Sequence, residues 1–219
     1  MRVPHRPPRL SDAEALARGD ALLTRMSARR SVRAFSPDPV PRALIERAIQ
    51  VAGTAPSGAH QQPWTFVAVS DPALKAEIQA AAEAEERAFY GGRAPEAWLQ
   101  ALLPLGTTWQ KPFLGVAPWL VVLFAQRHGL SAEGDPVKHY YVSESCGIAA
   151  GLFISAVHEL GLVTLPHTPS PMGFLRELLG RPAHESAMIL FPVGHPAPDA
   201  DVPDLRRKGL DEIAVFWEG

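Results

Sequence analysis

Apolar residues recur at two different spacings along the chain, which predicts a mixture of helices and strands. Where they recur every three to four residues, they fall on one face of a helix. Helices are predicted for residues 12–26, 41–52, 72–90, 95–111, 136–160 and 174–179. Pro104 is expected to interrupt the fourth of these, and Gly147 and Gly151 give the fifth a small-residue face that another helix can approach closely.

Short apolar runs bounded by turn residues predict four strands, at residues 64–69, 119–124, 163–165 and 188–193. The run 119–124 is apolar without interruption, which is typical of a strand covered on both faces. Because strands and helices do not alternate regularly, a doubly wound parallel sheet is not indicated. We therefore predict an α+β fold with a central mixed or antiparallel sheet flanked by helices.

The composition narrows the class of protein without naming a chemistry. The chain has 219 residues, enough for one domain with a full core, and 47% apolar and 20% charged residues are ordinary globular values. With 21 basic and 23 acidic residues it has no general attraction for nucleic acid or an anionic membrane. Its one cysteine, Cys146, cannot form an intrachain disulfide, which suits the cytoplasm.

Several familiar sites have no support in the sequence. A Gly-x-Gly-x-x-Gly fingerprint after a strand, a Walker loop and a His-Glu-x-x-His motif are all missing, and the eight histidines are scattered. We expect no metal site. An enzyme of this composition is expected to take its chemistry from an organic cofactor.

A basic cluster near the first predicted helix is the first candidate site. Arg29, Arg30, Ser31 and Arg33 place three guanidinium groups and a hydroxyl within five positions, a combination suited to binding phosphate. Judged by charge alone, a solvated basic turn is the preferred interpretation, since runs of charge usually face solvent. A second basic group, at residues 206–208, lies near the other end of the chain, and spacing does not tell whether the two converge.

Together with the loop at residues 55–64, this cluster resembles the flavin-binding signature of the nitroreductase superfamily. Within that superfamily the chain is most similar to the iodotyrosine deiodinase family of FMN-dependent reductive dehalogenases. The resemblance covers roughly residues 27–215 and includes the segments 53–60, 161–164, 179–185, 192–194 and 202–208. It implies a nitroreductase-like fold and an interlocked homodimer with FMN in the interface. The chain is expected to be one domain with an N-terminal arm (1–11) and an extended C-terminal arm (196–219).

The resemblance also implies which residues bind the cofactor. The expected FMN ligands are Arg29, Arg30, Ser31, Arg33, Ser57, Gly58, Thr168 and Arg207. The backbone amide of Ala59 is expected to meet the phenolate oxygen of a halotyrosine, since a buried charge needs a partner. Without the resemblance, Ser57 and Gly58 would be taken as an ordinary turn.

Three further residues match those with which this family holds the substrate zwitterion. Glu86 would take the ammonium and Lys111 the carboxylate, while Tyr90 adds a hydroxyl and an apolar wall. Glu86 and Tyr90 are four residues apart, hence on one face of a helix. The alternative is that all three are surface or packing residues. The segment 86–111 is expected to be a mobile substrate lid.

Thr168 matches the residue that hydrogen-bonds flavin N5 and favours one-electron steps in the family. Its alternative role is that of a turn threonine. Pro166 and His167 stand where the animal enzymes have threonines, and His167 is given no role. The chain is also expected to lack the N-terminal membrane anchor of those enzymes.

The expected function is FMN-dependent reductive dehalogenation of halotyrosines, with NAD(P)H or a partner reductase as the electron source. A general NAD(P)H-dependent nitroreductase or quinone reductase is the alternative on the same fold. A halotyrosine- or flavin-binding protein without turnover is a third possibility. The zwitterion-binding residues are what distinguishes the halotyrosine dehalogenase from the general nitroreductase.

Overall fold

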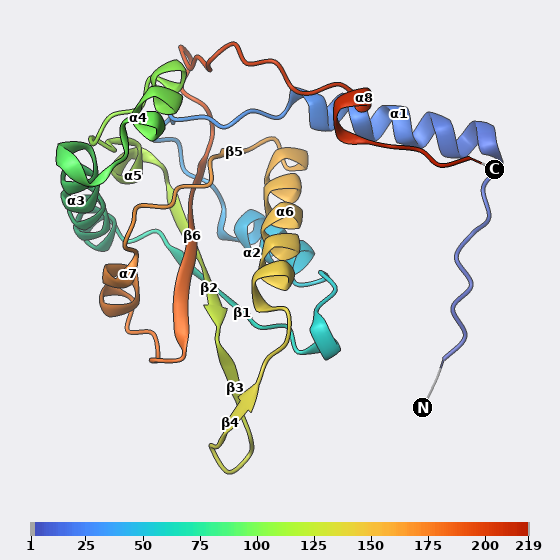
Figure 1. Ribbon diagram of the computed structural model, residues 1–219, viewed down its shortest axis with the longest axis horizontal. Helices are drawn as coiled ribbons and strands as arrows, with labels where there is room; N and C mark the ends of the chain where they lie inside the picture. The colour runs from blue at the N-terminus through green and yellow to red at the C-terminus, as the bar shows by residue number, and fades with distance from the viewer. Residues whose placement is uncertain (1–2, 219) are drawn as a thin grey trace.

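The computed structural model describes residues 3–218, and its centre is a four-stranded antiparallel sheet (Figure 1). The strands are ordered β1-β2-β6-β5. Their bounds are β1 Trp64–Val69, β2 Trp119–Gln126, β6 Glu185–Gly194 and β5 Val163–Thr164. The α+β class and all four predicted strands are confirmed.

Strand β2 is buried on both faces, as its uninterrupted apolar sequence predicts. Val121 and Leu123 point into one core cluster, and Leu120, Val122 and Phe124 into another. All five side chains have no exposed surface. Antiparallel pairing with β1 and β6 satisfies the backbone of β2, so this strand holds the sheet together.

Helices cover the two faces of the sheet. The first core cluster packs beneath α2 (Arg42–Ala52) and α6 (Val142–Glu159). The second lies beneath α3 (Pro72–Ala88), α5 (Phe113–Val116) and α7 (Gly173–Leu178). Figure 1 shows α2 and α6 on one side of the sheet and α3 and α7 on the other. The molecule is therefore a three-layer structure with two separate apolar cores.

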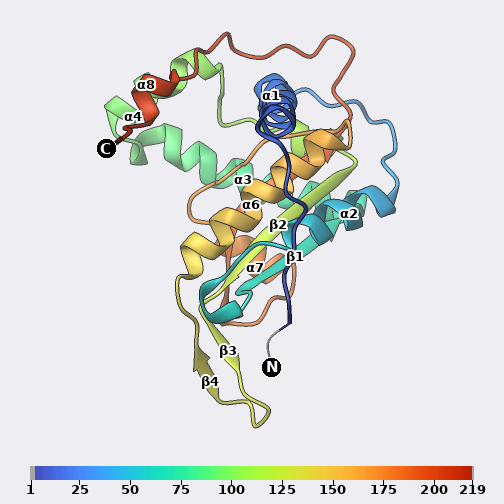
Figure 2. The same ribbon diagram turned by 90° about the vertical axis from the view of Figure 1, so that its right-hand side faces the viewer.

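Helix α1 (Asp12–Ala28) projects from this body (Figures 1 and 2). A capping box between Ser11 and Glu14 starts it, yet none of its residues is buried. The C-terminal arm contacts the end of α1 through a hydrogen bond from Arg207 to the carbonyl of Ser27, and then carries the short helix α8 (Leu210–Ile213), which Figure 2 shows away from α1. Large apolar side chains are exposed in both segments, among them Leu16, Leu23 and Trp217.

One predicted helix, 136–160, was wrong at its start. The structure forms a hairpin there from β3 (His128–Leu130) and β4 (Pro136–Lys138), and α6 begins only at Val142. Gly134, with φ of +90°, makes the turn, and Pro136 pairs with Leu130. The Asp-Pro pair that resembles a helix start therefore ends a hairpin turn instead.

The helices around the predicted lid also differ from the prediction. Helix α3 ends at Ala88 and is followed by a π-helical turn, Phe89–Arg93. Helix α4 (Glu96–Leu102) continues only into a 3₁₀ turn, Leu103–Leu105, so the predicted helix 95–111 was too long. Gly106 ends that turn with φ of +59°, a conformation that other residues rarely adopt.

The junction between β6 and β2 leaves no room for a side chain at Gly194. A Cβ there would lie 2.6 Å from Cδ of Pro118, whose ring cannot move aside, and 3.2 Å from Cδ1 of Phe35. Gly194→Ala is therefore expected to lower the free energy of unfolding by about 1–3 kcal/mol in urea denaturation. Gly173→Ala is the control, because nothing lies within 4 Å of a Cβ there. Equal stabilities of the two variants would contradict this account.

Candidate functional site

The two basic groups from opposite ends of the chain line one cavity of about 340 Å³. Arg29, Arg30, Ser31 and Arg33 come from the segment after α1, and Arg206 and Arg207 come from the C-terminal arm. This convergence could not be read from the spacing of the residues. The cavity also includes Leu105, so the predicted lid reaches it.

Hydrogen bonds from arginine side chains to backbone carbonyls join the segment after α1 to the C-terminal arm. Arg207 donates hydrogen bonds to the carbonyls of Ser27 (2.8 Å) and Arg29 (2.5 Å), and Arg30 donates to the carbonyl of Pro203. Ser31 also forms a parallel bridge with Thr164 of β5. The arginines are thus tied to the end of the sheet and to one another.

The cluster carries positive charge without compensating carboxylates. Within residues 3–218, none of Arg29, Arg30, Arg33 and Arg207 forms an ion pair with an acidic residue. Burial lowers the pKa of Arg29, and the neighbouring Arg207 and Arg30 lower it further. Burial also lowers the pKa of Arg33. Convergent guanidinium groups of this kind fit a phosphate dianion, which would relieve their mutual repulsion.

A second cavity of about 160 Å³ adjoins the first and shares Arg33 with it. It brings together Glu86, Tyr90, Lys111 and Thr168, which come from three separate parts of the chain. The apolar part of its lining is contributed by Phe89, Trp98, Leu102, Phe113 and Leu165. The predicted zwitterion-binding residues and the predicted N5 partner therefore lie around one space.

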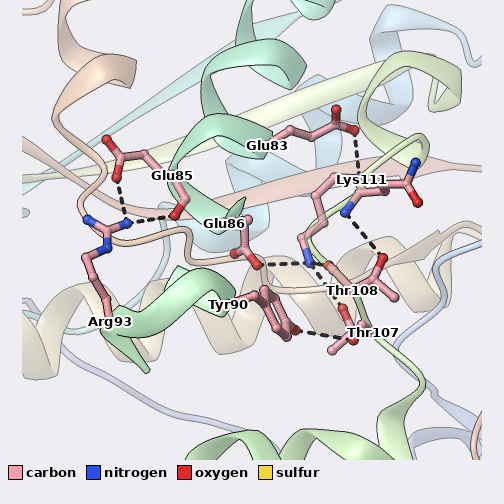
Figure 3. A network of polar contacts seen from close by, with 9 residues as sticks. Glu83, Glu85, Glu86, Tyr90, Arg93, Thr107, Thr108 and Lys111 are labelled. Atoms are coloured by element: carbon pink, nitrogen blue, oxygen red, sulfur yellow. Dashed lines mark hydrogen bonds and ion pairs between the residues drawn. The ribbon is translucent and has the colours of Figure 1, made fainter. Parts of the chain in front are cut away.

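Lys111 is at the centre of a polar network inside this cavity (Figure 3). Its Nζ lies 3.1 Å from Oε2 of Glu86, and their side chains are only 4% and 13% exposed. Nζ also donates to Oγ1 of Thr107 (3.1 Å) and to the carbonyl of Thr108. Burial lowers the pKa of Lys111, and the Glu86 carboxylate opposes this shift. A buried cation and anion in contact are well suited to binding a ligand that carries both charges.

Tyr90 and His167 complete the polar lining. The Tyr90 hydroxyl donates to the carbonyl of Thr107 (3.3 Å), and burial raises the pKa of this phenol. His167 is buried edge-on against Phe113, and its Nε2 has no hydrogen-bond partner in the described part of the chain. Burial, followed by Lys111 and Arg33, lowers the pKa of His167 to about 3. Its imidazole is therefore neutral at physiological pH and adds no charge to the cavity.

The other three predicted site residues lie elsewhere. Ser57 precedes a 3₁₀ turn, Gly58–His60, that packs on the N-terminal end of α6, where the Gly58 amide donates to Oγ of Ser145 (3.3 Å). His158, near the other end of α6, lines a cavity with Arg29 and Arg30. Ser145 and His158 are 13 positions apart along α6, which corresponds to a distance of roughly 20 Å. Within one chain, Ser57, Gly58 and Ala59 are therefore not brought to the arginines.

The backbone of this loop is strained. Ala59, His60 and Gln62 have φ values of 50°, 56° and 48°, which cost non-glycine residues about 1–2 kcal/mol each. A Cβ on Gly58 would lie 2.5 Å from the carbonyl oxygen of Tyr140. Strained loops of this kind are concentrated at functional sites.

Two contributors to the site were missed by sequence reasoning. Trp98, on α4, lines the second cavity, and nothing in its local sequence pattern distinguishes it from a packing residue. Glu83 accepts a hydrogen bond from the backbone amide of Lys111 (2.7 Å). Its position three residues before Glu86 on the same helical face was the available signal.

Residues 3–218 contain neither a membrane-spanning helix nor a cluster of metal ligands. None of the helices is long and apolar enough to cross a membrane. No group of three or more His, Cys, Asp or Glu side chains is arranged to hold a metal ion.

Known proteins resemble this chain over nearly all its length. The model of the nitroreductase family matches residues 26–195. Iodotyrosine deiodinase from Haliscomenobacter hydrossis is 48% identical over 215 residues, covering 98% of this chain and 97% of that protein. The protein of the same name from Danio rerio is 47% identical and the one from Homo sapiens, iodotyrosine deiodinase 1, is 45% identical, with 98% and 93% of this chain and 73% and 71% of those proteins covered.

Solved structures agree with the sequence comparison. A structure of oxidized iodotyrosine deiodinase bound to FMN and 3-iodo-L-tyrosine matches with a TM-score of 0.76 and 29% identity, over 89% of this chain and all of that one. A nitroreductase with bound FMN from Bacteroides fragilis has a TM-score of 0.67 at 20% identity, over 90% and 98% of the two chains, which supports the fold alone. The chain belongs to the nitroreductase family and, within it, to the iodotyrosine deiodinases.

Proposed function

We propose that this protein is an FMN-dependent oxidoreductase that removes halide from halotyrosines, converting 3-iodotyrosine to tyrosine and iodide. One observation carries the proposal: Glu86, Tyr90 and Lys111 meet in a cavity that also contains Arg33 and Thr168. A general nitroreductase has no need of paired charges for a zwitterion. Similarity to the FMN- and 3-iodo-L-tyrosine-bound deiodinase supports the same assignment.

FMN fits the arginine cavity by the chemistry of its lining. Arg29, Arg30, Ser31 and Arg207 would bind the phosphate, and Arg33, shared by both cavities, would contact the flavin edge. Thr168 would hydrogen-bond flavin N5. When bound, FMN supplies the electrons for cleavage of the carbon–halogen bond. The protein's own part is to hold the halotyrosine in position and exclude water.

The substrate zwitterion would be held by the buried ion pair. A halotyrosine entering between Glu86 and Lys111 would exchange their 3.1 Å contact for two, ammonium to Glu86 and carboxylate to Lys111. The Tyr90 hydroxyl would add a hydrogen bond. Because the side chains of Glu86 and Lys111 are largely removed from water, their ionic contacts are stronger than on the surface.

The segment 86–111 would act as the lid. Its residues provide Trp98 and Leu102 to the apolar wall of the cavity, and Gly92 and Gly106 have φ values of +145° and +59° near its two bends. Glycines in such conformations are suited to hinges. Closure of the lid would exclude water from the reacting bond.

Ser57, Gly58 and Ala59 would reach the flavin from a second copy of the chain. Three features support this homodimer: the separation of roughly 20 Å along α6 between this loop and the arginines, the uncovered face of α6 at Gly147 and Gly151, and the exposed apolar side chains of α1 and the C-terminal arm. In the dimer the amide of Ala59 would donate to the substrate phenolate. The two terminal arms of the chain would wrap the partner.

The electron donor would be NAD(P)H, acting directly or through a partner reductase. A reducing cytoplasm would suit such a donor, and it agrees with the free Cys146. Burial raises the pKa of this thiol to about 11, so Cys146 is an unreactive core residue and not a redox group.

Removing either partner of the ion pair tests the substrate class. Glu86→Gln and Lys111→Ala are each expected to raise the Kd for 3-iodotyrosine by about 10- to 100-fold, because one charge of the zwitterion is then unpaired. Titration of the FMN-loaded protein, followed by quenching of flavin fluorescence, measures this. Glu77→Gln, an exposed position on α3, is the control and is expected to bind normally. Unchanged affinity in both site variants would favour the general nitroreductase instead.

Thr168 is expected to affect chemistry more than binding. With dithionite as the reductant, Thr168→Ala is expected to lower the rate of iodide release about tenfold or more, while the Kd for 3-iodotyrosine changes less than threefold. Thr168→Ser retains the hydroxyl and is expected to retain most of the rate. Loss of rate and affinity in equal proportion, or an intact rate, would disprove the role.

Complementation between two inactive variants tests the shared site. Arg33→Glu and Ser57→Asp should each inactivate their homodimer, one on each side of the proposed interface. A heterodimer of the two, purified with two different tags, would contain one site with both substitutions and one intact site. It is expected to have about half of the wild-type activity. An inactive heterodimer from variants that both fold would mean that each site is built within one chain.

A further inference from the structure

Four polar side chains form one stripe along α3 and the turn that follows it. Gln79, Glu83, Glu86 and Tyr90 are spaced four, three and four residues apart, which places them on the same helical face over three turns. Figure 3 shows three of them, Glu83, Glu86 and Tyr90, facing the returning segment at Thr107–Lys111. A Cβ on Gly115 would lie 2.6 Å from Oε1 of Gln79, and Tyr90 bonds the carbonyl of Thr107 at the other end.

Glu83 binds the backbone of Lys111, whereas Glu86 binds its side chain. Its Oε1 accepts a 2.7 Å hydrogen bond from the backbone amide of Lys111, and the same oxygen accepts from Nε2 of Gln79 (3.0 Å). The carbonyl of Lys111 accepts from the amide of Leu114 (3.0 Å). The backbone of Lys111 is therefore held on both sides, by α3 and by the start of α5.

This backbone bond sets the starting point of a flexible side chain. Lysine has four rotatable bonds, so the position of Nζ depends on where the main chain is held. The ion pair of Glu86 with Lys111 also ties the two segments, but a bound zwitterion would replace that contact with two of its own. The hydrogen bond from the Lys111 amide to Glu83 is not broken in this exchange, since it involves the backbone of Lys111 and not its ammonium group.

We infer that Glu83 is a positioning residue for the amino-acid group of the substrate, acting through the backbone of Lys111. It keeps Lys111 at a set distance from Glu86 while the substrate separates their side chains. This inference rests on the proposed function, because it assigns Glu83 to the same zwitterion site. Its specific consequence is that Glu83 affects the binding of ligands that carry an amino-acid group and not of ligands that consist of the halophenol ring alone.

Two substitutions separate the hydrogen bond from the charge. Glu83→Leu leaves the Lys111 amide without a partner, whereas Glu83→Gln retains an oxygen that can accept from it. With FMN-loaded, full-length protein and dithionite, initial rates of iodide release over a range of substrate concentrations give kcat and KM for 3-iodotyrosine and for 2-iodophenol, which lacks the amino-acid group. Glu83→Leu is expected to lower kcat/KM for 3-iodotyrosine about tenfold, mainly through KM, and kcat/KM for 2-iodophenol less than twofold. Glu83→Gln is expected to stay within threefold of wild type for both.

An equal loss of kcat/KM for both substrates in Glu83→Leu, or no loss for either, would overturn the inference. A Glu83→Gln variant that lost the wild-type ratio of kcat/KM between the two substrates would overturn it as well. FMN content and thermal unfolding of each variant identify any general loss of folding. Glu86→Gln and Lys111→Ala, assayed beside them, keep the two proposals apart. If these change the ratio of the two substrates and Glu83→Leu does not, only the role of Glu83 fails. If they leave the ratio unchanged, the proposed function itself fails.

Discussion

The arrangement of this molecule depends on one constraint, which is that β2 must be buried on both faces. Its apolar side chains need a helical layer on either side, and α6 and α3 provide the main part of those layers. The functional segments are attached to these two helices. The proposed lid segment leaves the C-terminal end of α3, the loop of Ser57 packs against the start of α6, and the arginines lie near the end of α6. Packing of the core therefore fixes where each part of the site can be.

The same constraint explains why the charges gather at the edge of the sheet. The two cores accept few ionic groups, and Lys111 and Glu86 are buried at a place where they can pair with each other. The arginine cluster is different, because none of its four members from residues 29–33 and 207 is neutralised by a carboxylate in the described chain. One cavity thus contains a paired cation and anion and is suited to a zwitterion, while its neighbour carries unpaired positive charge and is suited to a dianion. Arg33 belongs to both, which places the two proposed ligands next to each other.

Sequence reasoning succeeded where a local pattern records burial and failed where structure depends on distant contacts. The apolar runs of β1 and β2 predicted strands correctly, and the spacing of Glu86 and Tyr90 predicted their common face. The hairpin before α6 was missed because an Asp-Pro pair starts helices and ends hairpin turns equally well. The meeting of Lys111 with Glu86, and of Arg207 with Arg29, crosses irregular segments whose course no local pattern records. Glu83 was overlooked because an acidic residue on an Ala-rich helix looks like any solvated side chain.

The proposed dimer follows from where a single chain leaves its two half-sites. The strained loop of Ser57 lies at one end of α6 and the arginines lie near the other, while the middle of the exposed face carries Gly147 and Gly151. If two copies of α6 cross antiparallel at these glycines, the start of each helix lies beside the end of the other. A two-fold axis there makes the contact self-complementary and assembles both sites at once. The same contact would cover apolar surface that the isolated chain leaves exposed, including Ile148 on α6. Within one chain, α6 keeps the Ser57 loop and the arginines apart. Between two antiparallel chains, the same helix brings the Ser57 loop of one copy beside the arginines of the other, so shared sites and interlocked arms both follow from this geometry.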